Sequence, residues 1–129
     1  MAAKEDSSVG GDVVVGAASA AVDQIISLDD LRWLKNSRSG YLSVVTVKRN
    51  EIEMLLSSEG DASRVKEKMS EFVAAFAAFH EAHAVYMSYL SDESNVLRCR
   101  ESFERESVRK DDFIHEVQGW IKRTEVIRF

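Results

Sequence analysis

The most regular hydrophobic pattern of the chain lies in residues 61–91. Large side chains recur there at alternating spacings of four and three residues. They form an unbroken heptad seam: Val65, Met69, Phe72, Phe76, Phe79, His83, Tyr86 and Leu90. Such a repeat is typical of a helix that packs against other helices, and the alanines beside it allow close approach. We therefore predict a helix of about 45 Å over residues 61–91, with Met69, Phe72, Phe76, Phe79 and Tyr86 largely buried.

Two weaker stripes predict helices on either side of this one. The first, over residues 28–57, begins at Ser27, which can cap it together with Asp30. Its stripe is Arg38, Leu42, Val45, Arg49, Ile52 and Leu56. The second, over residues 96–123, carries Cys99, Phe103, Glu106, Lys110, Phe113, Val117 and Trp120. Gly60 and Asp61 mark the first turn between helices, and the segment "SDESN" marks the second.

The remaining residues, 1–26, do not continue these patterns. Gly10, Gly11 and Gly16 interrupt the segment, and the run Val13–Val15 has no evident strand partner. We expect a flexible tail over 1–26 followed by one domain over 27–129. The chain contains no proline, which suits long uninterrupted helices. The predicted fold is all-α, an antiparallel three-helix bundle or coiled coil.

Composition and charge narrow the partners and the compartment. The net charge of -5 argues against nucleic acid as a main partner, because phosphate binding needs a basic surface. The apolar run "VVVGAASAAV" is too short to span a bilayer, and no basic targeting segment precedes it. The single cysteine, Cys99, suits a reducing compartment. We expect a cytoplasmic protein, with the nucleus as the alternative.

The histidines are the first candidates for chemistry. His80 and His83 are three residues apart, whereas the zinc motif of metalloproteases needs two histidines four apart. His115 and Cys99 do not complete a ligand set of the structural zinc type. We therefore expect no metal and interpret His83 as a polar group that sets the helix register. Its pKa should be depressed by burial unless a carboxylate such as Glu51 or Glu53 meets it.

Two arginines and the cysteine leave alternatives open. Arg38 and Arg49 interrupt an apolar stripe, and they either form salt bridges, mark a wet edge or bind an anion. Cys99 lies between Arg98 and Arg100, which suggests a reactive thiol, but sequence neighbours on a helix face different directions. A part-buried, unreactive thiol is the simpler interpretation. The sequence contains no phosphate loop, nucleophile elbow or kinase motif, so we expect neither catalytic residues nor a cofactor.

Residues 31–90 resemble the N-terminal helical region of Gag-like and BEL/Pao-type retrotransposon polyproteins. The matching positions are Lys35, Arg38, Gly40, Leu42, Thr46, Asn50, Ile52, Phe76, Phe79, His83 and Tyr86. The sequence lacks the Cys-x-x-Cys knuckle and the protease and polymerase motifs of such polyproteins. The resemblance therefore implies an isolated helical piece with a structural or assembly role, and it carries over no active-site residue.

These observations predict a non-catalytic structural or protein-interaction module. We expect a homo-oligomer, with a two-fold dimer favoured because that symmetry is the commonest. The helix over 61–91 should lie at or near the interface, because it has apolar residues on more than one face, with Val73, Val85 and Tyr89 outside the seam. The candidate seam and interaction residues are Met69, Phe72, Phe76, Phe79, His83 and Tyr86. One alternative is a cellular coiled-coil adaptor unrelated to retroelements. Another is a small metal-binding or enzymatic helical bundle.

Overall fold

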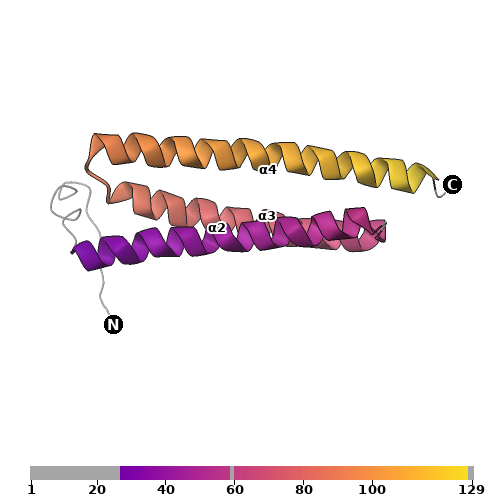
Figure 1. The fold of residues 1–129 in the computed structure, drawn as a ribbon, viewed down its shortest axis with the longest axis horizontal. Coiled ribbons are helices and arrows are strands. Elements are labelled where there is room, and N and C mark those ends of the chain that lie inside the picture. The colour runs from indigo at the N-terminus through magenta and orange to yellow at the C-terminus, as the bar shows by residue number, and fades with distance from the viewer. Residues whose placement is uncertain (1–26, 59, 128–129) are drawn as a thin grey trace. The chain divides into compact units, whose positions relative to one another are not determined.

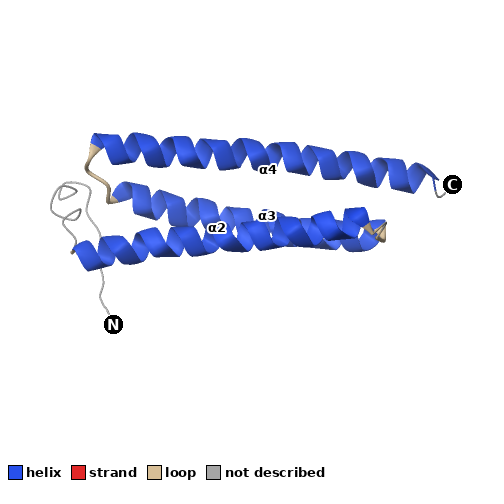
Figure 2. Ribbon diagram, viewed as in Figure 1, coloured by secondary structure: helices blue, strands red, loops and turns tan. Residues whose placement is uncertain are grey.

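The computed structural model describes residues 27–58 and 60–127. This part of the chain consists of three helices, α2 (Leu28–Ser57), α3 (Ala62–Ser88) and α4 (Glu93–Ile127), and contains no strand (Figure 1 and Figure 2). The predicted all-α fold is confirmed. The tail predicted over residues 1–26 lies outside the described residues.

The contacts of the chain divide it into two units, residues 1–33 and residues 34–129, with the boundary inside α2. The described part of the first unit is the beginning of α2. There the hydroxyl of Ser27 accepts a hydrogen bond of 3.0 Å from the backbone N–H of Asp30, as the sequence predicts for a helix cap. The packing described below concerns the second unit.

Helices α2 and α3 run antiparallel. Near the end of α3, the guanidinium Nε of Arg38 donates a hydrogen bond of 3.1 Å to Nδ1 of His83. Further along α2, the ammonium of Lys48 donates to Glu71 at 3.0 Å. Residue numbers rise along α2 while those of their partners on α3 fall, which defines the antiparallel direction.

Helices α3 and α4 are antiparallel by the same criterion. The rings of Phe72 and Phe113 lie 5.2 Å apart, and those of His83 and Phe103 lie 4.3 Å apart. The three helices therefore pack side by side through short turns (Figure 1). The predicted antiparallel three-helix bundle is confirmed for residues 34–127.

The hydrophobic core runs along α3. Its buried members are Val45, Ile52, Val65, Phe72, Phe76, Phe79, Phe113 and Val117. The seam residues Met69 and Tyr86 are half-buried rather than largely buried, because they lie at the edges of the seam. The phenylalanines make edge-to-face and tilted contacts, which add to the stabilisation that burial supplies.

Three predicted helix ends differ from those of the structure. Helix α3 ends at Ser88 rather than at residue 91. Helix α4 begins at Glu93, because the carboxylate of Asp92 caps it by accepting a hydrogen bond of 3.1 Å from the N–H of Asn95. It continues to Ile127 rather than ending at residue 123. At the start of α3, Asp61 is the cap that the sequence predicts.

No helix among the described residues combines the length and the apolar character that crossing a bilayer requires.

Candidate functional site

Most of the candidate polar residues meet in one cluster near the turn between α3 and α4. Arg38 of α2 donates to His83 of α3, and the thiol of Cys99 on α4 lies 3.7 Å from the same imidazole nitrogen. The ring of Phe103 stacks on the imidazole of His83 at 4.3 Å, nearly parallel to it. The guanidinium of Arg38 lies 5.1 Å from the ring centre of Phe79. We call Arg38, His83, Cys99 and Phe103 the histidine cluster.

The imidazole of His83 is neutral at ordinary pH. Burial, followed by the positive charges of Arg38 and His80, together lower its pKa to about 4. This outcome matches the prediction for a His83 without an acidic partner, and its hydrogen-bonded partner is an arginine instead of Glu51 or Glu53. Because Arg38 donates to Nδ1, the ring proton resides on Nε2.

This arrangement does not suit nucleophilic catalysis. A histidine that activates a thiol must accept the thiol proton at a free ring nitrogen. In the histidine cluster, Nδ1 of His83 already accepts from Arg38, and the low pKa of the ring makes it a poor base at neutral pH. Cys99 is half-buried, which agrees with the interpretation as an unreactive thiol. The contacts of the cluster join α2, α3 and α4 near this turn.

The histidines do not gather metal ligands. His80 packs on Phe103 with ring centres 5.0 Å apart, and His115 is an exposed residue of α4. The described residues contain no group of three or more histidine, cysteine or acidic side chains placed to hold a metal ion.

Arg49 is the second polar group of the interior, and it forms no ion pair at contact distance among the described residues, although the charges of Glu106 and Glu53 act on it. It is 6 % exposed, and its guanidinium lies about equally far from the rings of Phe72 and Phe113, at 5.9 and 6.0 Å. Its Nε and Nη2 atoms are buried without a hydrogen-bond acceptor. Burial lowers the pKa of Arg49. The salt-bridge alternative is therefore wrong for Arg49, which is held over aromatic faces instead.

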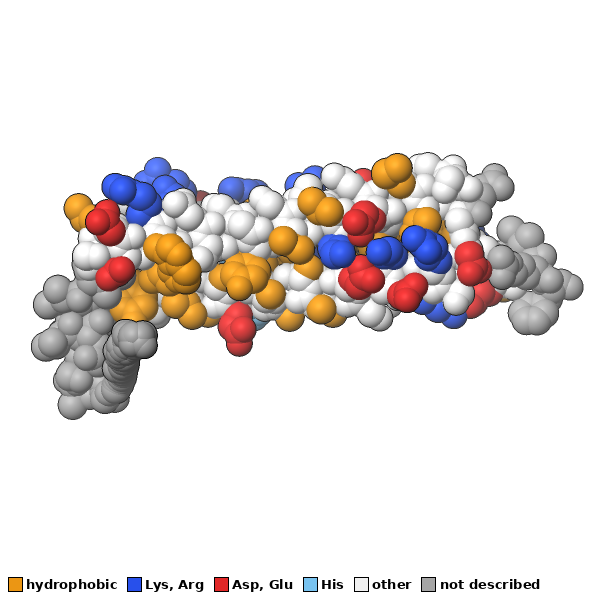
Figure 3. All heavy atoms as spheres, turned by 90° about the horizontal axis from the view of Figure 1, so that it is seen from below, with side chains coloured by type: hydrophobic (Ala, Val, Ile, Leu, Met, Phe, Trp, Pro, Cys, Tyr) orange, Lys and Arg blue, Asp and Glu red, His pale blue; other side chains and the backbone are white. Residues whose placement is uncertain are grey.

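A charged network covers one stretch of the line where α2 meets α3. Lys48 and Lys68 both bond the carboxylate of Glu71, at 3.0 and 3.3 Å, and both lie 3.7 Å from Glu51. The hydrogen bond from Lys48 lowers the pKa of Glu71 and raises that of Lys48. On the face drawn in Figure 3, basic and acidic side chains cluster in one stretch, and hydrophobic side chains dominate the stretch beside it.

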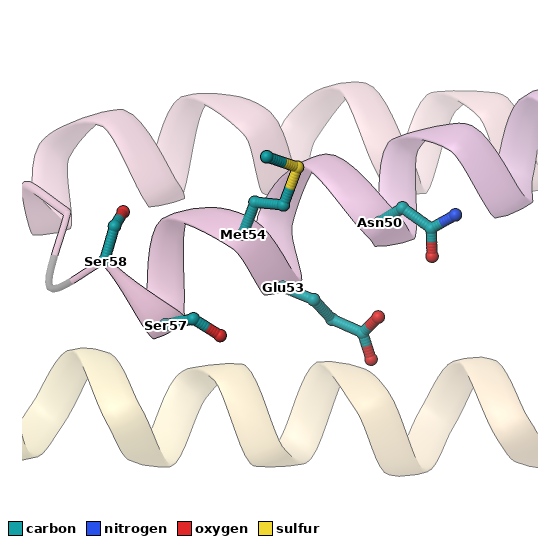
Figure 4. Close-up of a pocket in the computed structure, with 5 residues that line it drawn as sticks. All are labelled: Asn50, Glu53, Met54, Ser57 and Ser58. Atoms are coloured by element: carbon teal, nitrogen blue, oxygen red, sulfur yellow. The ribbon is translucent and has the colours of Figure 1, made fainter.

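A hollow beside the end of α2 does not form a binding site. It is lined by Asn50, Glu53, Met54, Ser57 and Ser58, all from α2 or the residue that follows it. Figure 4 shows that these side chains point in different directions instead of converging on a common point. Since binding sites are concave and have converging polar groups, this surface carries no ligand assignment.

A groove of about 530 Å³ between α3 and α4 is more informative. Its lining is mostly apolar, from Met69, Val73, Ala74, Ala77, Ile114 and Ile121, with the polar residues Lys66, Ser70 and Gln118 beside them. Val73 is 49 % exposed although it lies in the middle of α3. The groove is the strongest candidate for a surface that contacts another molecule.

No protein-family model, curated protein or solved structure matches this chain. The fold of the described residues defines the class of the protein, a small all-α bundle.

Sequence reasoning missed the central position of Phe103 and the groove. Phe103 is half-buried yet contacts Phe76, Phe79, His80 and His83. Its place in the stripe of α4 was evident from the sequence, but its ring contacts depend on the axial alignment of α3 and α4. The groove likewise has walls from two helices, and the pattern of either helix alone does not reveal it.

Proposed function

We propose that this chain is a non-catalytic protein-interaction module that associates through the outward side of α3. The observation that supports this proposal is the exposure of valines within a helix that packs against two others. Val73 is 49 % exposed on the side of the groove, and Val85 is 43 % exposed. Apolar side chains left exposed on a helix of a small bundle favour an interface, and Val73, which borders the groove, is the stronger of the two observations.

The composition of α3 favours a helical partner. Ala74, Ala77 and Ala84 are exposed, and such small side chains let another helix approach closely. Association would remove apolar surface of α3 from water, and each Å² of apolar surface buried stabilises the complex by about 25 cal/mol. Because a small bundle has a limited core, association would also add to the stability of the fold. We therefore propose self-association, with a two-fold dimer as the commonest form.

Solution mass tests the proposal directly. Light scattering at tens of micromolar should give the mass of a dimer, and dilution should reduce it towards 14.5 kDa. Circular dichroism on the same samples should show high helicity at every concentration. A monomer that keeps its helicity at tens of micromolar would contradict self-association.

We propose a Gag-like assembly piece of retroelement origin as the biological setting, on the basis of the resemblance over residues 31–90. A cellular coiled-coil adaptor would use the same surface. The genomic surroundings distinguish the two settings. Protease and polymerase reading frames downstream of the coding sequence support the first, and an isolated gene with introns and host regulation supports the second. In both settings we propose a cytoplasmic location, with the nucleus as the alternative.

A metal-binding or enzymatic bundle is the competing class. The occupied Nδ1 of His83 and the lack of a ligand group among the described residues speak against it. Elemental analysis of the purified protein tests this class. Stoichiometric zinc or iron that survives dialysis would contradict the non-catalytic proposal.

A further inference from the structure

The side of α3 that borders the groove carries a second helical stripe. We call it the outer stripe, and its members are Lys66, Ser70, Val73, Ala77, Glu81 and Ala84. They are three or four residues apart, as in the buried seam, but every one of them is exposed. The stripe has an apolar middle with a positive charge near its start and a negative charge near its end. This asymmetry restricts how a second helix can pair with it.

The sizes of the side chains fit an antiparallel copy of α3. We place a two-fold axis between Val73 and Ala74. Each residue of α3 then lies opposite the residue of the partner helix for which the two residue numbers add up to about 147. Val73 then faces Ala74 of the partner subunit, and Ser70 faces Ala77 of the partner subunit. The one bulky residue in the middle of the stripe meets a small residue, as close helix packing requires.

The charges fit the same axis. In this register Lys66 lies opposite Glu81 of the partner subunit, and symmetry repeats the pair on the other side. A parallel arrangement would place Lys66 opposite its own copy, which like-charge repulsion disfavours. Glu81 forms no ion pair within the described residues, and Lys66 is held at the groove by a bond of 2.6 Å to Glu125.

We propose that the partner of α3 is a second copy of this chain, paired antiparallel along the outer stripe about an axis between Val73 and Ala74. This inference rests on the proposed function. It adds the identity of the partner, a second copy of the chain, and the register in which the two α3 helices pair. The paired helices close the groove, because Val73 and Ala77 belong to both the groove and the stripe. Ile114 and Ile121 of α4 then form the apolar border of the interface.

Charge reversal is the first test. Lys66→Glu and Glu81→Lys should each weaken dimerisation about tenfold, since each replaces two attractions by two repulsions. The double variant Lys66→Glu/Glu81→Lys should restore the wild-type dissociation constant, measured by analytical ultracentrifugation. Glu125→Lys is the matched control, because it removes the internal bond to Lys66 without changing the proposed pair. A double variant as weak as the single variants would overturn the register.

A second pair of variants tests the surface. Val73→Glu places a carboxylate against Ala74 of the partner subunit and should weaken the dimer at least about a hundredfold. Val47→Glu is the control, because Val47 is similarly exposed, at 52 %, on α2. It should leave the dissociation constant unchanged. A dimer that persists in Val73→Glu would overturn this inference and the use of the outward side of α3, but it would leave self-association standing, whereas a monomeric wild-type protein would overturn self-association as well.

Cysteine cross-linking reads the register directly in a Cys99→Ser background. The variant Ser70→Cys/Ala77→Cys should form a disulfide-linked dimer under mild oxidation. Its two cysteines are about 10 Å apart within one helix, beyond the roughly 7 Å that a disulfide allows. In the control variant Ser70→Cys/Ala84→Cys, the second cysteine lies about two helical turns beyond the position that faces residue 70 in the partner subunit. This variant should therefore cross-link poorly. Preferential cross-linking of this control would overturn the proposed axis.

Discussion

Near the turn between α2 and α3, the helices meet through completely buried aliphatic side chains, namely Ile52, Val65 and Val117. Near the turn between α3 and α4, they meet instead through a hydrogen bond between Arg38 and His83. Both regions lie on the same uninterrupted seam of α3. A regular seam on one helix therefore does not fix whether the interior beside it is apolar or polar. That depends on the residues that α2 and α4 place against the seam.

The facing residues explain the contrast. At the polar end, α2 presents Arg38 and α4 presents Cys99, and both converge on the imidazole of His83. A buried polar group is tolerated when it has a hydrogen-bond partner, and His83 has one. Arg49 has no such bond, since both its Nε and its Nη2 atoms lack acceptors between Phe72 and Phe113, whereas Arg38 leaves only Nη2 without an acceptor and donates to His83 through Nε. The four predictions below test this comparison.

The largest expected effect is the loss of a core phenylalanine. Phe72 is completely buried, so Phe72→Ala should lower the free energy of unfolding by about 3–5 kcal/mol. Tyr86 is half-buried near the polar end, and Tyr86→Ala should cost only about 1–2 kcal/mol. Urea denaturation monitored by circular dichroism measures both losses. Equal losses would contradict the comparison of the two ends.

Acid should destabilise the fold through the polar end. The pKa of His83 is about 4 in the folded chain, below its ordinary value of 6.5. The unfolded state therefore binds a proton that the folded state refuses, and stability falls as the pH drops from 6.5 towards 4. The loss should reach about 2–3 kcal/mol. His83→Gln should remove this part of the pH dependence, and an imidazole that titrates above its ordinary pKa in an NMR experiment would refute the prediction.

Replacement of Arg49 should stabilise the interior. Met has a similar length without polar atoms, so Arg49→Met removes buried nitrogens that lack acceptors. We expect the free energy of unfolding to rise by about 1–2 kcal/mol. Arg38→Met is the matched comparison, and it should lower stability because it removes the donor to His83. If both variants shifted stability in the same direction, the distinction between the two arginines would fail.

The smallest effects concern two glycines, one inside α2 and one in the turn that follows it. A Cβ at Gly40 meets no atom within 4 Å, so Gly40→Ala should raise stability by about 0.5–1 kcal/mol through its better helix propensity. A Cβ at Gly60 would lie 2.9 Å from the backbone oxygen of Leu55, so Gly60→Ala should lower stability. Thermal unfolding of the two variants should therefore shift in opposite directions.

Much of the fold could be predicted because its signals are local. The seam spacing indicates the helical period of α3, and Ser27 and Asp61 mark two helix starts through hydrogen bonds to the next residues. The end of α4 at Ile127 was harder to predict. Its last residues have no break signal of their own, and the ion pair between Lys66 and Glu125 spans two helices that are far apart in sequence. A contact of that kind depends on how the helices are aligned.

Three helices, their order and the buried face of α3 follow from the sequence, because propensity, capping and periodicity act between residues close in the chain. The pairing of the polar groups emerges from the packing of the folded chain. That packing paired His83 with Arg38 instead of an acid and left Arg49 between two phenylalanine rings. It also left Val73 exposed above an apolar groove. Those outcomes depend on the rotation and axial alignment of neighbouring helices, which packing of the whole interior settles at once.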